Sequence, residues 1–187
     1  MNGEQIERAL RQDKFASQSF VGVFAADRLP VEEFPGSYVV NTDKTGQPGQ
    51  HWVAFYTVDD TIECFDSFGK NPGVYNVYTK KWLEDTYKVI QRETIQSDDT
   101  TICGQHCLFF ILLRSYKLSY EDVMSAYTEN TEFNDRLVCK FINKFCMLNT
   151  TVRDKYFLLK SIKAKMNSRE QLLVQRKPAS PLPLCTP

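Results

Sequence analysis

Two stretches of the chain carry residue types that can do nucleophilic chemistry. Cys103 opens an apolar run in the stretch DTTICGQHCLFF (99–110), and His51 opens the stretch HWVAFYTV (51–58). A helix N-terminus lowers the pKa of a thiol, because its partial positive charge stabilises the thiolate. A histidine can pair with such a thiolate, and catalysis also needs a group that orients the histidine and donors for an oxyanion.

Asp66 and Gln96 are the residues that can complete such a site. A turn near residues 59–60 separates two strand-like runs, and it predicts a hairpin in which His51 and Asp66 lie close to cross-strand partners. A carboxylate there can accept the imidazole N–H and hold its tautomer. Gln96 precedes Cys103 by seven residues, so its amide can donate to an oxyanion beside the Cys103 backbone N–H. The predicted roles are base for His51, orienting acid for Asp66, oxyanion donor for Gln96 and nucleophile for Cys103.

Each of these residues also has an ordinary structural interpretation, since a single cysteine is more often a buried hydrophobe than a nucleophile. His106 is a rival base, but it lies one turn further into the same helix, and we predict a packing role for it. A metal site built from Cys103, His106 and Cys107 is a third alternative. It lacks a second ligand pair at zinc-finger spacing, since Cys139 and Cys146 are seven residues apart, and we predict no metal. The aromatic residues after the hairpin are interpreted as packing, with a substrate groove as the alternative: Phe65, Phe68, Tyr75 and Tyr78.

The composition is that of one folded domain with reduced thiols. The chain has 187 residues, of which 42% are hydrophobic, and six of them are cysteines. Its formal net charge is zero, so the overall charge indicates neither a nucleic-acid nor a membrane partner. The first fifteen residues are charged and amphipathic, without the apolar region of a signal peptide. The longest apolar run, at 107–113, is far shorter than the roughly 20 residues of a membrane span. We expect an intracellular, reducing compartment, no membrane contact and a monomer.

Hydrophobic periodicity predicts an α+β fold, with strands in the first half and helices mostly in the second. The expected sheet is small, mixed or antiparallel, and flanked by helices, with Cys103 at a helix N-terminus. Expected strands cover 36–42, 51–58, 61–68 and 89–96. Expected helices cover 4–12, 77–88, a buried run from Cys103, a segment with Ser119 as N-cap, and 134–148.

The end of the chain differs in composition from the rest. We predict one catalytic domain over residues 1–166 and a basic, then proline-rich, disordered tail over 167–187. Between residues 153 and 177, eight Lys or Arg residues stand against one Asp and one Glu, a net charge of +6. Such a segment can contact a phosphate backbone. We favour the alternative of a solvated helix face followed by a charged tail.

Four quoted segments together resemble one known family: SFVGVFAADRLP, VVNTDKTGQPGQHWVAFYTV, CFDSFG and IQSDDTTICGQHCLFF. They are similar to adenovirus-type (adenain-like) cysteine proteases, which include relatives encoded by Maverick/Polinton elements, over roughly residues 1–150. The resemblance implies an endopeptidase that cleaves virion precursor proteins at small-residue, glycine-containing sites. It implies a host nuclear or cytoplasmic setting, or packaging in virions. It also implies the same roles for His51, Asp66, Gln96 and Cys103.

Two departures from the family bear on substrate and activation. Adenovirus enzymes carry Glu at the position of Asp66, whereas the related SUMO and ubiquitin-like-protein proteases carry Asp, so an isopeptidase is an alternative. The seven-residue spacing from Gln96 to Cys103 favours the adenain-like enzymes. The stretch EDTYKVIQ (84–91) lacks the cysteine through which the adenovirus enzyme links its activating peptide. The family also uses DNA as a cofactor, which leaves segment 153–177 as the candidate contact. The chemistry itself requires no cofactor, and an inactive homologue that binds DNA or serves as a structural protein is the alternative from another class.

Overall fold

The computed structural model describes residues 1–30, 35–84, 87–90 and 93–147, which form a mixed α+β fold. Five strands form one sheet in the order β1-β2-β3-β4-β5. Their bounds are Phe20–Ala25 (β1), Gly36–Asn41 (β2), Trp52–Val58 (β3), Thr61–Phe65 (β4) and Tyr87–Ile90 (β5). The three central strands are antiparallel, whereas β1 and β5 run parallel to their inner neighbours. The prediction of an α+β fold with a mixed sheet is therefore confirmed.

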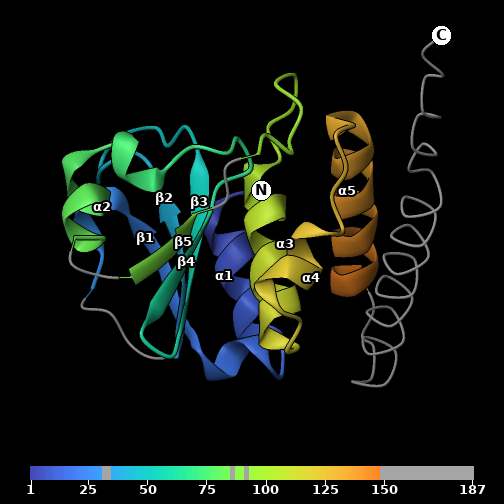
Figure 1. Ribbon diagram of the computed structural model, residues 1–187, viewed down its shortest axis with the longest axis horizontal. Coiled ribbons are helices and arrows are strands. Elements are labelled where there is room, and N and C mark those ends of the chain that lie inside the picture. Colours follow the sequence, from blue (N-terminus) through green and yellow to red (C-terminus); the bar gives the residue numbers. More distant parts are fainter. Residues whose placement is uncertain (31–34, 85–86, 91–92, 148–187) are drawn as a thin grey trace, which may run out of the picture.

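The helices cover both faces of this sheet. They are α1 (Gly3–Gln12), α2 (Val77–Trp82), α3 (Cys103–Ser115), α4 (Tyr120–Met124) and α5 (Thr131–Met147), with short 3₁₀ turns η1 (Ala16–Gln18), η2 (Ala26–Arg28) and η3 (Pro72–Val74). Helices α1 and α3 lie on one side of the sheet, α5 lies outside α3, and α2 lies on the other side (Figure 1). Ser119 caps α4 by accepting a hydrogen bond from the Asp122 backbone N–H, as predicted.

Two apolar clusters alternate along the strands and pack on opposite faces. Val39 and Ala54 belong to the cluster under α1 and α3, whereas their strand neighbours Val40 and Val53 belong to the cluster on the α2 side. Helix α3 is buried on all sides from His106 to Leu113, because it lies between the sheet and α5. This position explains why the helix that begins at Cys103 contains the unbroken apolar run 107–113.

Two expectations about the edges of the sheet were wrong, and one edge strand was missed. The helix expected over 77–88 ends at Trp82, and the strand expected over 89–96 is β5, which starts at Tyr87 and ends at Ile90. Parallel pairing with β4 decides these limits, and the local pattern does not show that pairing. Strand β1 was missed because Gly22 interrupts its apolar pattern at a register shift.

The described helices include none with the length and apolar character that crossing a bilayer requires. Three predictions lie outside the described residues. They are the domain boundary at 166, the disordered tail 167–187 and the basic segment 153–177.

Candidate active site

The β3–β4 hairpin brings His51 and Asp66 together. Val58 pairs with Thr61 across a two-residue turn, in which Asp59 adopts a φ of 51°. His51 directly precedes β3, and Asp66 directly follows β4, one residue beyond the strand in which we expected it. The imidazole Nε2 lies 2.7 Å from the Asp66 Oδ1 oxygen. The predicted pairing is therefore present in the structure.

Asp66 is fully buried and is held by two further hydrogen bonds. The Phe68 backbone N–H donates to Oδ1 at 2.9 Å, and the Tyr75 hydroxyl donates to Oδ2 at 2.7 Å. Burial and the adjacent Asp66 carboxylate raise the pKa of Tyr75, which keeps the phenol protonated as a donor. Both carboxylate oxygens are thus fixed, and Oδ1 is directed at His51.

Cys103 is the first residue of α3 and is 8% exposed. Burial by itself raises the pKa of this thiol, but the neighbouring His51 side chain and the backbone N–H groups of Trp52 and Gly104 lower it below the usual value. The structure therefore brings Cys103 to His51, and it favours the thiolate there.

His51 lies between the carboxylate and the thiol. Burial by itself lowers the pKa of His51, but the hydrogen bond with Asp66 and the interactions with Asp66 and Cys103 raise it to about 9. Because Nε2 is bound to Asp66, Nδ1 is the ring nitrogen available to Cys103, and Nδ1 has no hydrogen-bond partner among the described residues. The rings of Phe68 and Tyr75 lie 4.9 and 5.5 Å from the imidazole and restrict its rotation. At neutral pH the arrangement favours an imidazolium beside a thiolate.

Gln96 lies in the loop before α3 and is 1% exposed. Its Oε1 accepts a hydrogen bond from the Ser67 hydroxyl at 2.7 Å. Its Nε2 donates to the Thr100 carbonyl oxygen at 2.8 Å and to the Thr100 hydroxyl at 3.3 Å. Within the described part of the chain, Gln96 makes no hydrogen bond to His51 or Cys103. Its amide connects the residue after Asp66 with the loop that leads into Cys103.

His106, the rival base, is directed away from the thiol. It is fully buried, with Nε2 2.9 Å from Asp135 Oδ1 and Nδ1 3.4 Å from the Tyr127 hydroxyl. Burial lowers the pKa of His106 against the opposing effect of Asp135, which favours the neutral ring. No group of three or more His, Cys, Asp or Glu side chains suited to a metal ion occurs among residues 1–30, 35–84, 87–90 and 93–147.

Sequence reasoning missed four polar residues around the site: Ser67, Tyr75, Thr100 and Asp135. Tyr75 was interpreted as packing, although its hydroxyl binds Asp66. Asp135 contacts Thr100 across 35 residues of chain, and a single sequence carries no signal for such a contact. Ser67 had one usable signal, because it directly follows the predicted acid.

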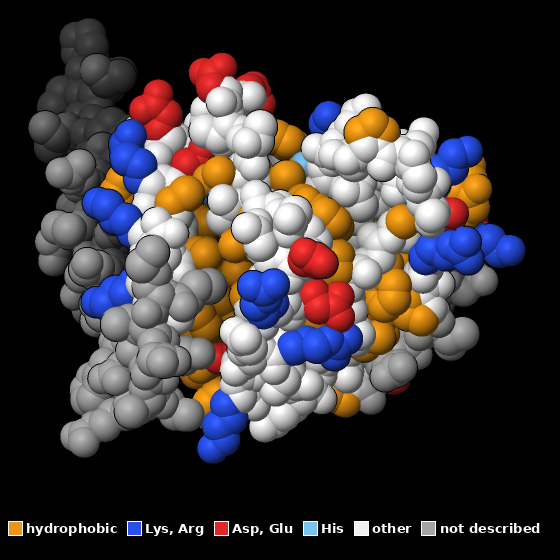
Figure 2. All heavy atoms as spheres, turned by 180° about the vertical axis from the view of Figure 1, so that it is seen from behind, with side chains coloured by type: hydrophobic (Ala, Val, Ile, Leu, Met, Phe, Trp, Pro, Cys, Tyr) orange, Lys and Arg blue, Asp and Glu red, His pale blue; other side chains and the backbone are white. Residues whose placement is uncertain are grey.

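The surface beside the site carries exposed apolar side chains. Val74 and Val77, which flank Tyr75 in the sequence, are 68% and 71% exposed, and Tyr78 is 45% exposed. At the end of the molecule where α2 lies, which is to the right in Figure 2, apolar and basic side chains lie next to one another.

In comparisons with known proteins, no family model matches the chain and no curated protein matches it. The functional argument therefore rests on the geometry of the site. Among the described residues, Cys64, Cys103, Cys107 and Cys139 are free thiols.

Proposed function

We propose that the chain is a cysteine endopeptidase of adenain-like fold, with Cys103, His51 and Asp66 as its catalytic triad. One observation carries the proposal: a buried series of contacts runs from Asp66 through the His51 ring to the Cys103 thiol. The same contacts lower the pKa of the thiol and raise that of the imidazole. Shifts in these directions, at groups in direct contact, are those that an activated nucleophile requires.

The reaction proceeds through an acyl-enzyme. The Cys103 thiolate attacks the peptide carbonyl carbon, and the carbonyl π electrons move to its oxygen. As the tetrahedral intermediate collapses, the C–N bond breaks, and the His51 imidazolium protonates the leaving amine from Nδ1. Neutral His51 then takes a proton from water, the hydroxide attacks the thioester, and the thiolate leaves with the carboxylic acid released. Asp66 holds the ring throughout, and Gln96 and the Cys103 backbone N–H donate to the oxyanion.

The proposed substrates are precursor polypeptides of a virion or capsid, cut at small-residue, glycine-containing sites. This part rests on the resemblance of the sequence. No metal or cofactor takes part in the proposed chemistry, and DNA contact through segment 153–177 remains a separate hypothesis. An isopeptidase for ubiquitin-like proteins is the alternative that Asp66 favours, and a panel of ubiquitin-like probes tested beside precursor peptides separates the two activities.

The first test is alkylation of each thiol by iodoacetamide as a function of pH, read site by site by mass spectrometry of the peptides obtained by digesting the labelled chain. Below pH 7 we expect Cys103 to react far faster than Cys139, whose pKa burial raises and which serves as a control within the same molecule. The His51→Ala variant is expected to lose this advantage. If Cys103 reacts no faster than Cys139, the triad does not exist and the proposed function is wrong.

A further inference from the structure

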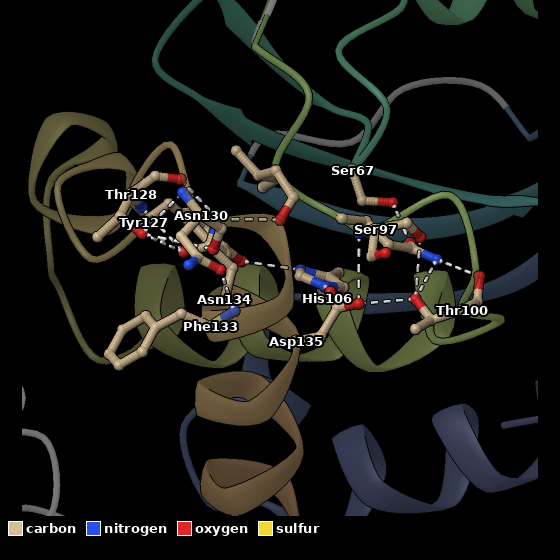
Figure 3. Close-up of polar contacts among 12 residues, drawn as sticks. Ser67, Ser97, Thr100, His106, Tyr127, Thr128, Asn130, Phe133, Asn134 and Asp135 are labelled. Carbon is tan, nitrogen blue, oxygen red and sulfur yellow. Dashed lines mark hydrogen bonds and ion pairs between the residues drawn. The ribbon is translucent and has the colours of Figure 1, made fainter.

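We propose that Thr100 and Asp135 are positioning residues, which hold the Gln96 amide as an oxyanion donor and connect it to the helix that carries Cys103. The inference rests on the proposed function and goes beyond the predicted donor. Figure 3 shows the polar contacts that link Ser67, Thr100, Asp135 and His106 in one region.

The hydroxyl of Thr100 is the first link. Its oxygen lies 2.7 Å from Asp135 Oδ2 and 3.1 Å from the Ser97 carbonyl oxygen. The single hydroxyl proton goes to the carboxylate, which is both the closer and the charged acceptor. The lone pairs of the Thr100 oxygen then face Gln96 Nε2 at 3.3 Å.

The Gln96 Nε2 atom makes two hydrogen bonds of unequal length. The bond to the Thr100 carbonyl oxygen, at 2.8 Å, is of ordinary length, whereas the bond to the Thr100 hydroxyl, at 3.3 Å, is long. A negatively charged oxygen is a better acceptor than a hydroxyl at that length. The long bond is the one that an oxyanion replaces, and until then it keeps the N–H oriented.

Helix α5 anchors the whole segment before the nucleophile. Asp135 Oδ2 also accepts the Ser97 backbone N–H at 3.3 Å, and the neighbouring Asn134 donates from Nδ2 to the Ile95 carbonyl oxygen at 3.0 Å. Asn134 is fully buried and Asp135 is 6% exposed, so these bonds are shielded from water.

Asp135 also reaches the nucleophile helix. Its Oδ1 lies 2.9 Å from Nε2 of His106, which belongs to the first turn of α3 after Cys103. Neutral His106 donates its Nε2 proton to this carboxylate, and Nδ1 faces the Tyr127 hydroxyl. One carboxylate therefore connects the Gln96 loop to α3, and the amide is held relative to the Cys103 backbone N–H.

The test compares two reactions of the same thiol. Acylation by p-nitrophenyl acetate passes through a tetrahedral oxyanion, whereas alkylation by iodoacetamide does not, and neither reagent requires the natural substrate. For Thr100→Val we expect acylation of Cys103 to slow about tenfold, a part of the loss typical of removing an oxyanion donor. The alkylation rate and its pH profile are expected to stay within about twofold of the wild type, since the thiolate is untouched.

Three further variants make the comparison specific. Thr100→Ser keeps the hydroxyl and is expected to restore acylation. Thr101→Val makes the same change at the exposed neighbouring residue and is expected to alter neither reaction. Gln96→Ala is expected to slow acylation at least as much as Thr100→Val. The double variant is expected to be no slower than Gln96→Ala alone, because both substitutions remove the same function, the donation from Gln96 to the oxyanion.

Two results for Thr100→Val would overturn the inference: an equal loss of both reactions, or no loss of acylation. Equal loss means that the hydroxyl supports the site as a whole and does not position the donor. A wild-type Cys103 that shows no selective alkylation overturns the proposed function itself, and the inference with it, before any variant is compared.

Discussion

His51 binds a buried carboxylate through Nε2 and interacts electrostatically with a neighbouring thiol. The pKa of about 9 reflects both partners, because burial alone lowers it. Below that value the ring is imidazolium and can protonate a leaving amine. The pKa of Cys103 lies below that of an ordinary thiol, so the pair carries both charges between the two values.

The pH dependence of kcat/KM follows from these two shifts. On the acid side the rate rises as Cys103 loses its proton, and on the alkaline side it falls as His51 loses its proton near pH 9. In Asp66→Asn the imidazolium loses its charged partner, so the alkaline limb is expected to move to lower pH and kcat/KM to fall by about 10²–10⁴-fold. The measurement is a full pH–rate profile of both proteins.

The matched control for that profile is Asp60→Asn, in the exposed hairpin turn. It removes one carboxylate from the same hairpin without touching the imidazole, and its profile is expected to overlay the wild type. An alkaline limb that stays near pH 9 in Asp66→Asn would show that Asp66 does not control the charge of His51.

The start of α3 depends on two other elements. A Cβ atom at Gly104 would lie 3.1 Å from Ile6 Cδ1 of α1, 3.3 Å from the Met1 carbonyl oxygen and 3.4 Å from Trp52 Cδ1 of β3. The helix that presents Cys103 is therefore seated directly against α1 and the strand that follows His51. The elements that contact this glycine are distant from it in the sequence.

Substitution of Gly104 tests this seating. We expect Gly104→Val to lower the free energy of unfolding by about 1–3 kcal/mol through overpacking, and to slow Cys103 alkylation as α3 shifts. Gly104→Ala is expected to lower the free energy of unfolding by less than Gly104→Val does, because alanine favours the helix by about 1 kcal/mol relative to glycine. Urea unfolding of the three proteins gives the order, and a Val variant as stable as the Ala variant would contradict it.

Helices and the central hairpin were predictable, whereas the sheet edges and the polar support of the site were not. The apolar run after Cys103 and the turn at Asp59 are local patterns, and they were enough to predict α3 and the pairing of His51 with Asp66. Strand β5 takes its limits from pairing with β4. Asp135 binds Thr100, Ser97 and His106 from 29 to 38 residues away, and spacing within one sequence does not encode such contacts.

Across the whole molecule, one ion pair connects the far end of α3 to the sheet. Arg114 Nε lies 2.6 Å from Glu63 Oε2, and a second guanidinium nitrogen lies 2.8 Å from Oε1. The guanidinium also stacks over the Tyr56 ring, 4.8 Å from its centre, and donates to the Leu118 carbonyl oxygen. Together with the contacts of Gly104, this pair holds α3 to the sheet at both of its ends.

Removal of one partner of this pair should be costly. In Arg114→Met the Glu63 carboxylate, 5% exposed, stays buried without its partner, and the free energy of unfolding is expected to fall by about 3–5 kcal/mol. Arg136→Met, which removes a cation from the exposed i,i+4 pair with Glu132, is expected to cost at most about 1 kcal/mol. Denaturant midpoints measure both, and equal losses would show that the buried pair has no special role.

The anchoring of the Gln96 loop by α5 also has a consequence for the order of events on the ribosome. His51, Asp66, Gln96 and Cys103 all emerge before Asp135, which follows Thr100 by 35 residues. A nascent chain that has completed α3 already contains the proposed nucleophile and its proposed base. The carboxylate to which we assign the positioning of Gln96 arrives only with α5, so on this proposal the site is complete only after the last described helix has docked.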